Sequence, residues 1–153
     1  MATAYKADNY GQPFTSSPFA GIEMVRDFLY TLTGAFVIND TIKLVAMKAS
    51  SGLILDSFFI DVIDLDSNVS PAVKLDLGDT DTAAKFVSAS TLGQSAAILI
   101  PGCTGYVAAS LPVKYTADKD FILKINTAPA TSATTGVLKG HIRYHNIGIA
   151  TVL

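Results

Sequence analysis

The chain has 153 residues, of which 50% are apolar and 16% are charged, and its formal net charge is −2. This length is enough for one domain whose hydrophobic core is stable without disulfides. The sequence has no cluster of Lys and Arg, no uncharged apolar run of about 18 residues and no apolar leader, so we expect no nucleic-acid binding, no membrane helix and no secretory signal. Because few charges are present to cover the surface, we also expect apolar surface to be buried against other subunits.

Residues 1–22 differ from the rest of the chain and are predicted to form an extended N-terminal arm. The segment is polar and rich in turns, and Pro13 and Pro18 oppose a helix. An extended segment with spaced aromatic side chains suits binding along a neighbouring subunit. The predicted partner-binding anchors are the aromatic residues that recur every four or five positions, Tyr5, Tyr10, Phe14 and Phe19. A tail without a binding role is the alternative interpretation.

Residues 23–153 are predicted to form one domain of short strands separated by turns. The β-prone segments, in chain order, are 27–33, 41–48, 52–66, 73–77, 94–101, 111–116, 120–126, 136–145 and 147–153. A turn at 117–119 predicts a hairpin between its two flanking segments, and the apolar segment 94–101 is predicted to be buried on both faces. Segment 81–87 predicts the only helical turn, capped by Asp79 or Asp81.

This order of strands and turns predicts an all-β fold, an antiparallel and jelly-roll-like β-sandwich with one short helix and less than a fifth of helix in all. A parallel α/β fold would need helices between the strands, and the pattern has none. The predicted core consists of apolar residues from the strand and helix segments, namely Leu44, Ile54, Phe58, Ile60, Leu75, Leu77, Phe86, Ile98, Ile122, Ile125 and Ile142.

The acidic turn at residues 64–68, DLDSN, is the first candidate metal site, because its oxygen side chains alternate as calcium ligands do. An EF-hand would then need Gly and Glu where this chain has Val69 and Leu75, so that motif is rejected. A looser cation site shared with Asp79 and Asp81 stays open. The alternative is that these side chains form hydrogen bonds with the backbone of their own turn.

His141 and His145 are the second candidate site. On a helix this spacing joins two imidazoles, but on a strand it leaves them about 13 Å apart, at about 3.3 Å per residue, with Arg143 between them. We therefore expect a row that faces solvent or an interface. Ser95 lacks the second glycine of a nucleophile elbow, and Cys103 is a single cysteine without a catalytic signature. The sequence thus predicts no catalytic residue, no metal, no cofactor and no enzyme.

Three segments of the chain resemble small β-rich virion proteins of tailed bacteriophages, namely ILDSFFIDVIDLDS, VKLDLGDTDTAAKFVSAST and TGVLKGHIRY. Several proteins of that family are capsid decoration or cement proteins. The resemblance implies a virion structural protein that binds the assembled capsid and reinforces contacts between major capsid protein subunits. It also implies self-association, with a trimer favoured, and a place on the capsid exterior after assembly in the host bacterial cytoplasm.

Two other functions remain open from the sequence. Lectin-like modules also use β-sandwiches, so the chain is alternatively a receptor- or glycan-binding head fibre or tail-associated module. Exposed Tyr106, Tyr115 and Tyr144 around a concave face would favour that function. A neck or tail-completion protein is the other alternative. The number of copies in the virion separates these functions, because a shell protein is present in hundreds and a neck protein in a handful.

Overall fold

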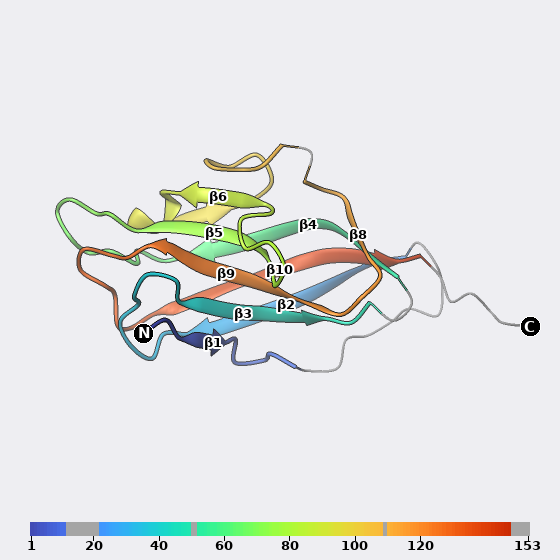
Figure 1. Cartoon of the computed structure of the whole chain (residues 1–153), viewed down its shortest axis with the longest axis horizontal. Coiled ribbons are helices and arrows are strands. Elements are labelled where there is room, and N and C mark those ends of the chain that lie inside the picture. Colours follow the sequence, from blue (N-terminus) through green and yellow to red (C-terminus); the bar gives the residue numbers. More distant parts are fainter. Residues whose placement is uncertain (12–21, 50–51, 109, 148–153) are drawn as a thin grey trace, which may run out of the picture.

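The computed structural model describes residues 1–11, 22–49, 52–108 and 110–147. Its strands are β1 (Ala4–Lys6), β2 (Glu23–Thr31), β3 (Thr41–Met47), β4 (Leu53–Val62), β5 (Lys74–Asp79), β6 (Val87–Ser90), β7 (Ala97–Leu99), β8 (Val113–Tyr115), β9 (Lys119–Thr127) and β10 (Val137–Asn146). They form two sheets that enclose one apolar core (Figure 1). Sheet A has the order β1-β3-β9-β5-β6, and sheet B has the order β2-β10-β4-β7, with β8 also paired to β4.

The predicted all-β sandwich is confirmed. All strand pairs are antiparallel except β1 with β3. Helix is limited, in the part of the chain that the structure describes, to one 3-10 turn, Leu92–Gln94. No described helix has the length and apolar character needed to cross a membrane.

A β-bulge at Asp56 decides which side chains of β4 reach the core. In the pairing with β10 the register skips Asp56, which lies between Leu55 and Ser57. One extra residue moves all later side chains to the opposite face. Leu55 is therefore buried before the bulge and Phe58 after it. The prediction of Ile54 as a core residue is wrong, because Ile54 lies before the bulge on the other face and is only half-buried.

The predicted core is otherwise confirmed except at the edge of sheet B. The predicted residues that are buried are Leu44, Phe58, Ile60, Leu75, Leu77, Phe86, Ile122, Ile125 and Ile142. Ile98 is 47% exposed and Ile100 is 42% exposed. Strand β7 was predicted to be buried on both faces, and this is wrong because β7 pairs only with β4 and has one face open to solvent.

Two local predictions fail because tertiary contacts override them. Strands β8 and β9 do not form a hairpin, since β8 pairs with β4 in sheet B while β9 lies between β3 and β5 in sheet A. Segment 81–87 is a turn rather than a helix. The Asp79 carboxylate accepts the N–H groups of Asp81 and Thr82, as a helix cap would. The Phe86 N–H, however, donates to the Leu77 carbonyl of β5 rather than to Thr82, so the segment closes as a turn against the strand.

Asp79 also links the two sheets where β5 ends. Its buried carboxylate accepts a hydrogen bond from Tyr115 of β8 at 2.8 Å and pairs with the Lys85 ammonium at 2.7 Å. Burial disfavours the charged carboxylate, but Lys85, the Thr82 N–H and Tyr115 hold its pKa below the usual value. The Lys85 ammonium lies 4.6 Å from the centre of the Tyr115 ring. Charge, hydrogen bonds and ring contact therefore join sheet A to sheet B here.

The substitution Phe86→Ala is expected to lower the free energy of unfolding by about 3–5 kcal/mol. The Phe86 ring is fully buried, and its centre lies 6.1 Å from that of Phe58 and 5.8 Å from that of Phe121. Ile98→Ala is the control, and its exposure predicts a loss within about 1 kcal/mol. Chemical denaturation of both variants measures the difference. Equal losses would contradict the placement of Phe86 in the core.

Candidate functional site

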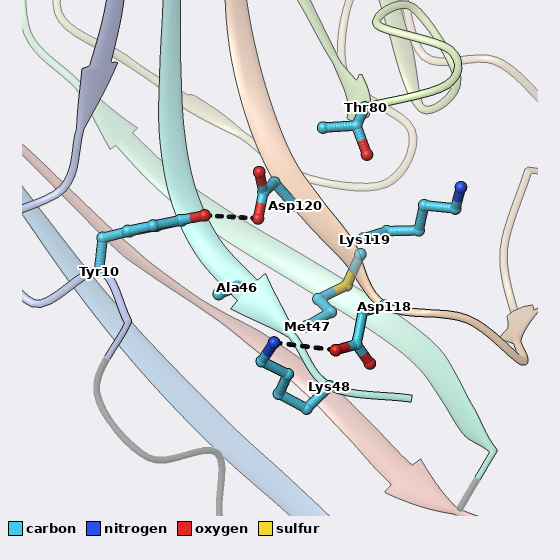
Figure 2. Close-up of a pocket in the computed structure, with 8 residues that line it drawn as sticks. All are labelled: Tyr10, Ala46, Met47, Lys48, Thr80, Asp118, Lys119 and Asp120. Carbon is cyan, nitrogen blue, oxygen red and sulfur yellow. Dashed lines mark hydrogen bonds and ion pairs between the residues drawn. The ribbon is translucent and has the colours of Figure 1, made fainter. Parts of the chain in front are cut away.

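A pocket of about 150 Å³ lies where β3 ends and β9 begins (Figure 2). Charged side chains line it, but they already form ion pairs. Lys48 pairs with Asp118 at 2.8 Å, and Lys119 pairs with Asp81 at 2.7 Å. Exposed pairs of this kind contribute little energy and leave no lone base or acid aimed into the pocket. We interpret the pocket as a solvated, ion-paired surface.

Two of the four predicted anchors pack on their own domain. Tyr5 lies in β1, and its ring meets Tyr30 and Phe36 edge to face with centres 6.1 and 5.5 Å apart. Tyr10 donates a hydrogen bond to Asp120 at 2.6 Å at the rim of the pocket in Figure 2. Burial, this bond and the Asp120 charge raise the pKa of Tyr10 to about 12. Tyr10 therefore remains a hydrogen-bond donor at neutral pH.

The described part of the predicted arm belongs to the surface of the sandwich. Residues 4–6 add a parallel strand to the edge of sheet A, beside β3. Phe14 and Phe19 lie outside the described residues. The boundary between arm and domain at residues 22 and 23, and partner binding by the four anchors, stay predictions.

The outer face of sheet B carries the row of His141, Arg143 and His145 along β10, as predicted. The two imidazoles do not share a ligand. His141 stacks on Phe59 with ring centres 5.4 Å apart, and His145 Nδ1 lies 2.7 Å from the Asp56 carboxylate. Each histidine is thus used in packing or pairing within the face. No three His, Cys, Asp or Glu side chains of the described chain gather as a metal site.

Asp66 holds two loops together through their backbone. Its buried carboxylate accepts five N–H groups, two from the loop before β10 and three from its own loop; the donors are Ala130, Thr131, Asn68, Ala72 and Val73. Burial disfavours the charged form, but the N–H groups hold the pKa of Asp66 well below its usual value. Donors occupy both oxygens, so the turn-bonding alternative describes Asp66 and the calcium interpretation does not.

Comparison with known proteins identifies the fold. No family model and no curated protein matches the sequence. Among solved structures, a chain from the capsid of Ralstonia phage GP4 has a TM-score of 0.76 at 22% identity, with 94% of this chain and 98% of that chain covered. A chain from the capsid asymmetric unit of cyanophage Pam1 has a TM-score of 0.64 at 24% identity, with 88% and 94% covered. The chain shares its fold with chains of two phage capsids.

Asp66→Asn is expected to lower the free energy of unfolding by about 2–5 kcal/mol. The amide keeps the shape but replaces one acceptor oxygen by a donor, so buried N–H groups lose their partner. Asp64→Asn is the matched control, because Asp64 is exposed and its oxygen can still accept the Asp66 N–H. Thermal or denaturant unfolding of the two variants makes the comparison. A similar, small loss in both would show that Asp66 does not hold the loops.

The low pKa of Asp66 also predicts how stability depends on pH. A carboxyl group whose pKa is lower in the folded chain stabilises the fold fully above its unfolded value, about 3.9. That stabilisation is lost as the pH falls below this value toward the folded pKa. The Asp66→Asn variant is therefore expected to lose less stability than the wild type between about pH 5 and pH 2. Parallel acid titrations that show the same slope would contradict this.

Proposed function

We propose that the chain is a virion structural protein that decorates the assembled capsid of a phage. It binds the shell exterior and reinforces contacts between major capsid protein subunits, without catalysis. The physical effect is additive. Each copy buries apolar surface at the junction of subunits, at about 25 cal/mol per Å² before the costs of association, and the contact repeats over the shell.

The observation that carries this proposal is the match to the GP4 capsid chain over nearly the full length of both chains. The match covers 94% of this chain and 98% of that chain, so nearly all of both chains takes part in the shared fold. The match therefore supports a capsid component built on this sandwich. The resemblance of the sequence to small virion proteins points the same way.

The three tyrosines whose exposure would favour glycan binding do not form an aromatic surface open to solvent. Tyr144 and Tyr115 are buried, and Tyr106 packs on Phe58 with ring centres 6.5 Å apart. A sugar cleft needs aromatic faces open to solvent, and these three rings serve the core. This favours a structural role over a receptor- or glycan-binding one.

Self-association, with a trimer favoured, is part of the proposal. The outer face of sheet B supports it, since Val25 is 52% exposed and Leu29 is 41% exposed there. Arg143 on the same face pairs with Glu23 at 3.3 Å, so these charges do not repel a second copy. A sedimentation experiment is expected to give three times the mass of one chain. A monomer at all concentrations would remove this part of the proposal.

The copy number in the virion tests the proposal as a whole. Quantitative mass spectrometry of purified particles is expected to find hundreds of copies, in a fixed ratio to the major capsid protein. Particles assembled without the chain are expected to lose their genome at a lower temperature, because each missing copy removes a contact between subunits. A handful of copies per particle would indicate a neck or tail protein and would contradict the proposal.

A further inference from the structure

Three loops at one end of the sandwich form a nearly uncharged surface, which we call the neutral end; they are residues 32–40, 63–73 and 128–136. They connect β2 to β3, β4 to β5 and β9 to β10, and Figure 1 shows them together at one end of the molecule. The three loops contain no Lys, Arg or Glu. Two of their three aspartates are buried, so the only exposed charged side chain in these loops is Asp64.

The neutral end is held in shape by hydrogen bonds between its loops. Besides the bonds that Asp66 accepts, the Phe36 N–H donates to Ser132 Oγ at 2.8 Å. The Asn68 amide donates to Thr131 Oγ1 at 3.0 Å. These bonds tie loops 32–40 and 63–73 to loop 128–136, which lies between them in the network. A surface that is already ordered loses little conformational entropy when it binds a partner.

Aliphatic side chains project from this rigid surface. Val69 is fully exposed, Ile38 is 53% exposed and Val37 is 42% exposed. Single exposed aliphatic residues are common on proteins, but here they share a surface that is depleted of charge. Depletion of charged residues around apolar ones is the composition found at the centre of protein interfaces.

The opposite end of the sandwich, in contrast, is rich in charged side chains. There β3 and β5 end and β9 begins, and three lysine–aspartate pairs lie within 2.8 Å; they are Lys48–Asp118, Lys85–Asp79 and Lys119–Asp81. Figure 2 shows the pocket between these elements. Most of these side chains are partly solvated, and burying them under a partner would carry a desolvation cost. We call this the ion-paired end.

We infer that the neutral end docks on the capsid shell while the ion-paired end faces solvent. This inference rests on the proposed function. The partner surface is an uncharged patch of the assembled shell, with apolar recesses that take Val69 and Ile38. The absence of Lys and Arg from the three loops disfavours a nucleic-acid partner, which needs cations. Contact through uncharged groups is also only weakly screened by salt.

The experiment measures binding of the purified chain to shells of the phage that encodes it, assembled without it. Val69→Asp and Ile38→Asp are each expected to weaken binding at least about tenfold, since they place a charge in the contact. Val107→Asp is the matched control, because Val107 is 37% exposed between β7 and β8, outside the three loops, where its N–H bonds the Phe86 carbonyl beside β6 of sheet A. It is expected to bind as the wild type does. Melting temperatures near that of the wild type confirm that the variants are folded.

Each outcome decides the matter. Loss of binding by the two loop variants alone supports the inference, as does wild-type binding that barely changes between about 0.1 M and 1 M salt. If the loop variants bind as well as the wild type does, the proposed function stands and the neutral end is not the docking surface. If the loop variants instead change the oligomeric state of the free chain, the neutral end is an interface between copies. If the wild type itself does not bind, both proposals are wrong.

Discussion

The buried carboxylate of Asp66 holds together two of the three loops of the neutral end, residues 63–73 and 128–136. Five backbone N–H groups surround it, and two of them belong to residues 64 and 65 positions further along the chain. Apolar side chains of these loops, such as Leu65 and Val73, pack into the core, but their buried N–H groups still need an acceptor, because a buried N–H without a partner is costly. The carboxylate therefore fixes the shape of a surface that carries no ion pairs. The same N–H groups lower the pKa of Asp66 and keep it ionised. The hydrogen bonds that order the loops therefore also stabilise the carboxylate charge.

The sandwich separates two kinds of chemistry along its length. Where β3 and β5 end and β9 begins, lysines and aspartates pair in a solvated pocket. At the other end, the loops expose Val69 and Ile38 and contain no Lys or Arg themselves. A monomer selected only for solubility has no reason to place its charges in this way. This distribution of charge is what the docking proposed for the neutral end would require.

Local patterns in the sequence predicted most of the strands, since alternation is a property of neighbouring residues. The bulge at Asp56 was not predictable, because residues 53–55 before it and 58–60 after it are all apolar, so either alternation of the strand buries apolar side chains. Crossing between sheets at residues 116–118 is decided by partners distant in sequence, so the hairpin prediction failed. The Asp66 turn was weighed correctly as a local alternative, but its donors at Ala130 and Thr131 could not be seen. Likewise, the sequence shows that the three loops lack Lys, Arg and Glu. It does not show that the loops lie at the same end of the sandwich, because that depends on the strand topology.

A cryo-EM map of the particle with the chain in place shows which surface touches the shell. Docking by the neutral end predicts density for the sandwich on the outside of the shell, with residues 32–40, 63–73 and 128–136 against the shell and Lys48 and Lys119 pointing to solvent. A map in which the ion-paired end or the outer face of sheet B touches the shell would contradict the assignment of the neutral end. A particle that carries the chain only at the neck or tail would contradict the decoration function itself.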